Sequence, residues 1–199
     1  MTRLLFLLLA MALAGCAGPS VTLPSAVRMD SLAVRQGDLA RLQSWTIRGR
    51  LAIQTEREGW TVTLHWVQEK EHYTLRFIAP LGQGTYELNG NVDTVTLLTA
   101  DDQFLQADNP ENLMLDNLGW NVPLEGLKYW IRGLPEPDVV AESLVIDDRG
   151  RITDLRQSGW TISILRYVTV AGLDLPDKLF MQNDRFRLRL VIQDWITAT

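Results

Sequence analysis

Residues 60–66 read Trp-Thr-Val-Thr-Leu-His-Trp, with large apolar side chains at every second position. Successive side chains of a β-strand point to opposite faces of the sheet, so this alternation predicts a strand with one buried face. The same spacing returns in residues 73–77 and, most clearly, in residues 186–192, where arginines at first alternate with the apolar side chains. These segments predict a sheet with one apolar face.

The remaining chain adds more short strands, separated by turns. They are predicted at residues 86–88, 95–97, 143–147, 151–157, 160–168 and 178–182. Glycine, asparagine and aspartate mark the turns, as in Gly82-Gln83-Gly84 and Asp148-Arg149-Gly150. Roughly nine to eleven strands in sequence order, joined by short turns, favour an up-and-down antiparallel sheet. A sheet of that width is expected to curl.

About three helices are predicted beside the sheet. Residues 27–44 carry leucines near one helical face, although Gly37 is unfavourable in a helix interior. Asn109-Pro110 has the pattern of an N-cap followed by proline at the first helical position, and Gly119 ends that segment. Residues 124–135 carry a helical apolar stripe that closes at a glycine and a proline. Helices on one side of a curled sheet would fill or cover its opening.

The chain is rich in tryptophan, with Trp45, Trp60, Trp66, Trp120, Trp130, Trp160 and Trp195. Each of them is first of all a candidate core residue, because aromatic side chains dominate protein cores. Taken together, they also fit a curled sheet too wide to be filled, which leaves a dry apolar hollow that an acyl chain could enter. The candidate cavity residues are Leu64, Trp66, Phe77, Leu88, Leu97, Leu127, Ile131, Leu188 and Leu190.

The N-terminus has the features of an export signal. Arg3 precedes an unbroken apolar run of eleven residues, 4–14, which is shorter than the about 20 residues that span a bilayer. The run ends in Leu13-Ala14-Gly15-Cys16, which resembles the bacterial lipobox; the alternative is a chance cysteine after an ordinary signal. The lipobox implies a signal peptide at residues 1–15, lipid on Cys16, a flexible tether at 16–26 and a folded domain at 27–199. Ala17, in place of an aspartate, favours the outer membrane.

Composition argues against several classes of function. The net charge is −5 without a long basic run, so nucleic-acid binding is disfavoured. Cys16 is the single cysteine, which excludes an intramolecular disulfide and a cysteine zinc cluster. His65 and His72 are expected at the surface, and no Gly-x-Ser-x-Gly turn is present. We therefore expect no enzyme activity, no metal, no cofactor and a monomeric chain.

Several short motifs together resemble the LolB family of outer-membrane lipoprotein receptors over nearly the whole mature chain. They are Gly49-Arg50-Leu51-Ala52-Ile53, Trp66, Pro80-Leu81-Gly82, Gly119-Trp120, Pro123, Trp130-Ile131-Arg132-Gly133-Leu134-Pro135, Gly159-Trp160, Arg166-Tyr167, Leu175-Pro176 and the closing Arg187-Leu188 to Trp195. The resemblance implies a mainly β fold with helices: a curled antiparallel sheet forming an incomplete barrel, with an apolar cavity covered by about three helices.

The same resemblance implies a function and partners. Members of the family accept acylated lipoproteins from a periplasmic, LolA-like carrier and insert them into the outer membrane, at whose periplasmic face they are anchored by lipid. Leu81, between Pro80 and Gly82, corresponds to a leucine that the family uses on a protruding loop for insertion. From the residues alone, Leu81 could equally be a buried turn leucine.

Two other classes remain open from sequence. One is a structural or assembly lipoprotein whose core is fully packed and whose surface binds a protein partner. The other is a lipid-acting hydrolase, which the missing catalytic motif disfavours. The row of Arg185, Arg187 and Arg189 is either a contact for the carrier or an ordinary solvated strand face.

Overall fold

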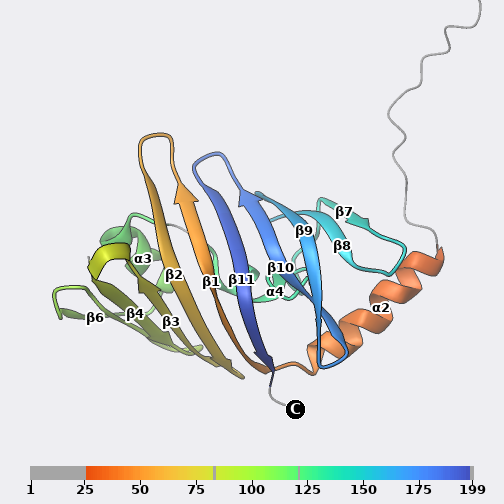
Figure 1. The fold of residues 1–199 in the computed structure, drawn as a ribbon, viewed down its shortest axis with the longest axis horizontal. Coiled ribbons are helices and arrows are strands. Elements are labelled where there is room, and N and C mark those ends of the chain that lie inside the picture. Colours follow the sequence, from red (N-terminus) through yellow and green to blue (C-terminus); the bar gives the residue numbers. More distant parts are fainter. Residues whose placement is uncertain (1–25, 83, 121, 198–199) are drawn as a thin grey trace, which may run out of the picture.

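The computed structural model describes residues 26–82, 84–120 and 122–197. They form one antiparallel sheet of eleven strands and three α-helices, which confirms the predicted fold class (Figure 1). The strands are β1 (Ser44–Gln54), β2 (Gly59–Glu69), β3 (His72–Ile78), β4 (Thr85–Gly90), β5 (Val95–Leu98), β6 (Phe104–Ala107), β7 (Ser143–Ile146), β8 (Ile152–Gln157), β9 (Trp160–Val170), β10 (Leu173–Gln182) and β11 (Arg187–Thr197). The helices are α2 (Ala26–Ala40), α3 (Pro110–Leu118) and α4 (Leu124–Trp130), with a short 3-10 turn, η1 (Pro80–Gly82).

The sheet is an open meander in which the first and last strands pair with each other at the centre. Its strand order is β6-β5-β4-β3-β2-β1-β11-β10-β9-β8-β7, so β1 pairs with β11 and all other pairs join chain neighbours. A Cβ on Gly49 would lie 2.3 Å from the Val191 carbonyl oxygen, which explains why a glycine stands at the irregularity in the β1–β11 pairing. The two edges, β6 and β7, are joined by the long connection that carries α3 and α4.

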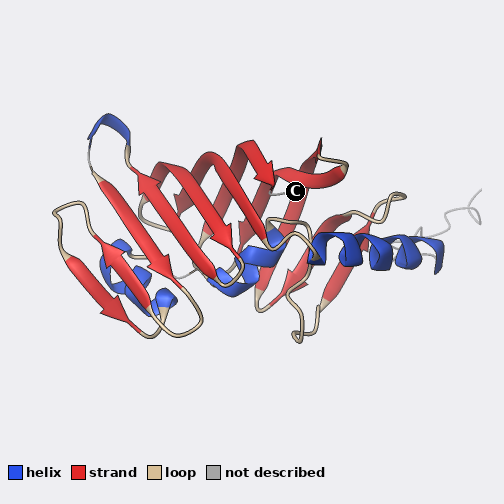
Figure 2. Cartoon of the chain, turned by 90° about the horizontal axis from the view of Figure 1, so that it is seen from below, coloured by secondary structure: helices blue, strands red, loops and turns tan. Residues whose placement is uncertain are grey.

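The apolar side chains of alternating positions lie on the inner side of the curved sheet. Along β2, Val62, Leu64 and Trp66 are buried, while the residues between them are more exposed. Figure 2 shows the strands bent into an open trough, with α3 and α4 on its inner side. The helices therefore cover the face on which the sequence places its large apolar residues. None of the helices in the described residues is both long and apolar enough to cross a membrane.

The helix boundaries follow local signals where these are strong. The Asn109 side chain accepts a hydrogen bond of 2.8 Å from the Asn112 N–H, and Gly119 ends α3 in the left-handed conformation, as its sequence predicts. In contrast, α2 ends at Ala40 rather than at residue 44, because Ser44 already pairs with Glu69 in the sheet. Likewise, α4 ends at Trp130, and the rest of its predicted span forms a turn.

Three strands differ from the sequence prediction. β1 was not predicted, although alternate residues along it are buried. β10 begins at Leu173, five residues before the predicted start at Lys178. The buried neighbours Leu175 and Pro176 break its alternation, and the register shifts after the proline, so the period-two pattern was hidden. The edge strand β6 was not predicted, because Phe104 points to solvent rather than to the core.

Gln157 on β8 connects the sheet to the segment that follows α4. Its buried Oε1 accepts hydrogen bonds from Trp130 Nε1 (3.0 Å) and the Glu136 N–H (2.9 Å). Its Nε2 donates to the carbonyl oxygens of Glu136 (3.0 Å) and Val139 (2.8 Å). One amide thus satisfies four groups, which fixes the path of the chain between α4 and β7.

Gln157→Leu is expected to lower the free energy of unfolding by about 2 kcal/mol. The apolar side chain keeps the volume but leaves the Trp130 indole N–H without an acceptor in the core, while the more exposed Glu136 and Val139 backbone groups regain water. Urea unfolding measures the loss. Gln193→Leu, at an exposed site on β11, is the matched control and should change stability little. Equal stability of the two variants would contradict the role of Gln157.

Candidate functional site

A narrow void of about 30 Å³ lies between the sheet and the helices. All of its lining side chains are apolar, and they come from β1, β2, β3, β10 and β11 on one side and from α3, α4 and their connection on the other. The lining residues are Leu51, Ile53, Leu64, Leu75, Phe77, Met114, Trp120, Val122, Leu124, Leu127, Met181, Leu188 and Leu190. Without polar partners for water, such a void is expected to be dry.

Five of the nine candidate cavity residues line this void, namely Leu64, Phe77, Leu127, Leu188 and Leu190. The other four, Trp66, Leu88, Leu97 and Ile131, are buried elsewhere in the core. Trp66 lies toward the other end of β2, where its ring is 5.1 Å from that of Trp45 and its Nε1–H donates to Gln68 Oε1. Leu88 and Leu97 pair with each other across β4 and β5, nearer the sheet edge.

On the helical side of the void, sequence reasoning identified only Leu127. Met114 on α3 and Trp120 after it carry no periodic signal that relates them to the sheet. Trp120 packs between Phe77, at a ring distance of 5.1 Å, and Trp60, at 6.4 Å. Its indole N–H is buried and has no acceptor among the described residues. The pairing of Trp120 with aromatic strand residues is visible only in three dimensions.

The volume of the void is small compared with that of the acyl chain that the predicted hollow would hold. A volume of about 30 Å³ has room for roughly two or three water molecules, far less than an acyl chain needs. An acyl chain therefore needs the cover formed by α3, α4 and their connection to move away from the sheet. In the structure, side chains fill most of the space between the sheet and these segments.

A few polar contacts hold this cover at its ends. Glu111 on α3 accepts a hydrogen bond of 3.0 Å from the Leu124 N–H, which links the two helices. The buried Arg132 donates from Nε to the Lys128 carbonyl (2.9 Å) and from Nη1 to the Leu42 carbonyl (3.0 Å), and its burial lowers the pKa of the guanidinium. Between these ends, α4 faces the void with Leu124 and Leu127.

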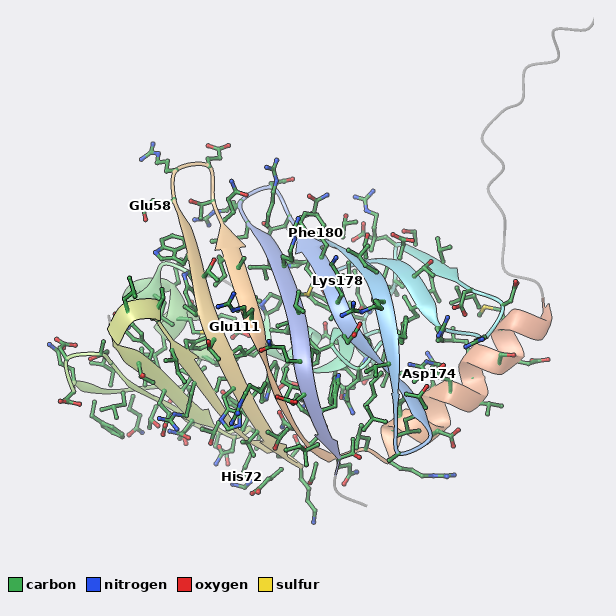
Figure 3. All side chains as sticks on the ribbon, in the orientation of Figure 1. Glu58, His72, Glu111, Asp174, Lys178 and Phe180 are labelled. Carbon is green, nitrogen blue, oxygen red and sulfur yellow. The ribbon has the colours of Figure 1, made fainter. Side chains whose placement is uncertain are left out.

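The helix α2 is tied to the opposite half of the sheet by a charged cluster. The guanidinium of Arg35 on α2 lies 5.3 Å from the centre of the Tyr167 ring and donates to the Asp174 carbonyl, and that of Arg151 lies 4.9 Å from the same ring. Figure 3 shows Asp174 beside α2. A hydrogen bond from Thr169 and the nearby arginines lower the pKa of Asp174, although burial acts against them. This cluster fixes α2 rather than forming a reactive site.

The Pro80–Gly82 turn holds its leucine away from the rest of the protein. Leu81 is 97% exposed, and its φ of 57° places it in the left-handed region, which roughly costs 1–2 kcal/mol for such a residue. A hydrogen bond of 3.0 Å from the Ala79 N–H to the Gly84 carbonyl closes the loop around it. The structure thus places Leu81 at an exposed tip, not in the buried turn that the residues alone allowed.

The turns at 55–58, 79–84, 99–103 and 183–186 share one end of the sheet, which we call the Leu81 end. Figure 3 shows Glu58 at this end and His72 at the other. The void lies toward the Leu81 end, because Ile53, Phe77 and Leu188 line it from strand positions next to these turns. An exposed leucine and an apolar void therefore occupy the same end of the molecule.

Within the described residues, the titratable side chains form no comparable site. His72 is exposed and His65 is half-buried on the outer face, opposite Arg48 and Arg76 on the neighbouring strands. Over the ranges that the structure covers, no group of three or more His, Cys, Asp or Glu side chains could hold a metal ion. Arg185, Arg187 and Arg189 are exposed.

Comparison with known proteins identifies the family. A family model described as "Outer membrane lipoprotein LolB" matches residues 43–195, from just before β1 almost to the end of β11. This chain belongs to the LolB family. The match includes the whole sheet, the Leu81 turn and the cover over the void, so the resemblance carried by the short motifs is confirmed.

Individual LolB proteins are similar over nearly their full length. A protein named "Outer-membrane lipoprotein LolB" from Nitrosococcus oceani is 39% identical over 183 residues, which is 92% of this chain and 91% of that protein. A protein with the same name from Stutzerimonas stutzeri is 35% identical over 189 residues, covering 94% of this chain and 91% of its own.

Solved structures show the same fold at low identity. A LolA-superfamily protein from Nitrosomonas europaea has a TM-score of 0.53 and 7% identity, covering 85% of this LolB-family chain and 93% of its own. A putative outer-membrane lipoprotein-sorting protein domain from Vibrio parahaemolyticus has a TM-score of 0.52 and 14% identity, covering 86% and 94%. The open sheet with helices on one face is therefore a fold that this chain shares with LolA-superfamily proteins.

Proposed function

We propose that this LolB-family chain is a lipid-anchored receptor that accepts acylated lipoproteins from a soluble, LolA-like carrier and inserts them into the outer membrane from its periplasmic face. The observation that carries the proposal is the wholly apolar void under two short helices. The names of the relatives, outer-membrane lipoproteins, support the location. No covalent step is needed for such a transfer, so the proposal requires no catalytic residue.

The proposed anchor is Cys16, exposed as the first residue once a signal peptide of residues 1–15 is removed. These residues and the tether up to residue 25 lie outside the described part of the chain. The first described residue, Ala26, already belongs to α2, so the tether would join the domain at this helix rather than after residue 26. A chain with several acyl groups at one cysteine would stay at the membrane, since each buried methylene contributes about 0.8 kcal/mol.

Transfer direction follows from differences in affinity. Acyl chains would displace the cover and occupy the enlarged void. Each 1.4 kcal/mol by which cargo binds this chain more tightly than the carrier raises the ratio of cargo on this chain to cargo on the carrier about tenfold. Because the void lies toward the Leu81 end, cargo would leave beside the exposed leucine. Leu81 would there enter the bilayer, which brings the void close to the membrane surface.

The test is a transfer experiment with the mature chain. Purified carrier loaded with one acylated lipoprotein is mixed with this chain, and the cargo is located by affinity capture of each partner. We expect the cargo to move to this chain, and then to liposomes when they are added. A non-acylated form of the same cargo is the control and should not move. Cargo that stays with the carrier would refute the proposal.

The small size of the void favours one alternative, an assembly lipoprotein with a packed core and a protein-binding surface. The two functions differ in whether the core opens for a ligand. A fluorescent acyl probe that binds and is displaced by fatty acid supports the receptor. A probe that never binds, even on long incubation, supports the packed core.

A further inference from the structure

A second apolar area lies beside the Leu81 turn, on the outer face of the sheet. Phe104 is 67% exposed and Leu98 is 38% exposed, and the two are directly paired across β6 and β5. Their strand neighbours Leu97 and Leu105 point inward, toward the core. An exposed phenylalanine and leucine side by side are more informative than scattered single apolar residues, because such patches mark contact surfaces.

The two apolar areas are physically connected. A Cβ placed on Gly84, at the end of the Leu81 turn, would lie 2.3 Å from the Cβ of Ala100 in the β5–β6 turn, so these turns touch. Figure 1 shows η1 above the bend of the edge hairpin that contains β6. Ile78, which is 37% exposed, lies on the same outer face below the turn, where Thr85 and Glu87 of β4 separate it from Leu98. We call the surface formed by Ile78, Leu81, Leu98 and Phe104 the apolar corner.

The chain segment that carries the apolar corner is acidic, and in the other turns at the Leu81 end Arg57 and Arg185 stand among Glu56, Glu58 and Asp184. From Phe77 to Leu127 the chain has no lysine or arginine. The same stretch has eight acidic residues: Glu87, Asp93, Asp101, Asp102, Asp108, Glu111, Asp116 and Glu125. Hydrogen bonds from Thr99 and Gln103 lower the pKa of Asp101 in the β5–β6 turn, so this carboxylate stays ionised. The adjacent Arg76 is paired with Glu87 at 3.2 Å.

We propose that the apolar corner is a two-point contact for a bilayer of zwitterionic phospholipids, with Phe104 and Leu98 as the second point beside Leu81. The proposal rests on the proposed function, in which Leu81 faces the membrane. Apolar side chains enter the interface of any bilayer, but anionic headgroups attract basic segments and repel acidic ones. Two contacts across touching turns fix the orientation of the domain, which a single leucine at a loop tip does not.

The experiment measures vesicle binding by the mature chain with Cys16→Ser, so that no lipid anchor dominates. The vesicles are pure phosphatidylcholine, or phosphatidylcholine mixed with an equal amount of phosphatidylglycerol. Phe104→Ser is expected to weaken binding to phosphatidylcholine about tenfold, because part of a phenylalanine side chain is no longer buried. The chain with Cys16→Ser alone should bind the vesicles that contain phosphatidylglycerol more weakly than those of pure phosphatidylcholine. Added salt should reduce the difference in affinity between the two kinds of vesicle.

Two comparisons make the result decisive. Val140→Ser removes an apolar side chain that is even more exposed, 86% against 67% for Phe104, near the opposite sheet edge, and should leave binding unchanged. Leu81→Ser should weaken binding as Phe104→Ser does. If Leu81→Ser weakens binding and Phe104→Ser does not, the second contact is refuted while the proposed role of Leu81 stands. If neither matters, the membrane role of this end fails altogether. Tighter binding to phosphatidylglycerol would overturn the lipid preference.

Discussion

Leu81→Glu is expected to leave the acceptance of acylated cargo intact and to slow its insertion into liposomes between about tenfold and a hundredfold. Leu81 is 97% exposed and contacts no core residue, so folding and the void should not change. Burying a leucine fully contributes about 1.5–3 kcal/mol, and glutamate loses that contribution and adds a charge that resists the bilayer. Liposome flotation after timed transfer from the loaded chain measures the insertion rate.

The matched control is Val92→Glu, which adds the same charge to a 73% exposed apolar residue. Val92 lies in the turn between β4 and β5, at the opposite end of the strand that leaves the Leu81 turn. Insertion by this variant should equal that of the unsubstituted chain. If both variants insert cargo at the unchanged rate, or if both are slowed alike, Leu81 has no special role at the membrane.

The strands were predictable wherever one face of the sheet is buried and the other is wet. In β2 and β11 alternate residues are buried, and the sequence pattern shows this directly. The pattern fails where tertiary contacts override alternation. At Leu175 and Pro176 two successive residues are buried, which conceals the first half of β10. The pairing of β1 with β11 lies beyond any local signal and was not predicted.

The candidate site was predictable in kind but not in size. Apolar residues on the strands identified one wall of the void, and Leu127 identified part of the other. The volume depends on how Met114 and Trp120 pack against Phe77, which is set by the path of a connection without periodicity. Exposure is equally hard to read from sequence: Leu81 and Phe104 look like any apolar residues near turns, and only the structure shows that neither reaches the core.

Leu127→Ala is expected to destabilise the chain by about 3 kcal/mol and also to tighten binding of a medium-length alkyl ester. Leu127 is 7% exposed and lines the void from α4. Removing three carbon atoms enlarges the void from about 30 Å³ to roughly 100 Å³. A ligand then needs to push α3, α4 and their connection less far from the sheet. A ligand that binds only the folded state then stabilises it, by about 2 kcal/mol at concentrations well above its dissociation constant.

Urea unfolding with and without the ester measures both effects. Leu155→Ala, on β8, is the control for destabilisation, because Leu155 is buried but does not line the void. That variant should lose similar stability and recover little of it, since an isolated cavity of one leucine cannot hold an extended alkyl chain. If the ester restores the stability of Leu127→Ala but not that of Leu155→Ala, its alkyl chain binds in the void between α4 and the sheet. Equal rescue of both variants, or of neither, would mean that acyl chains do not bind there.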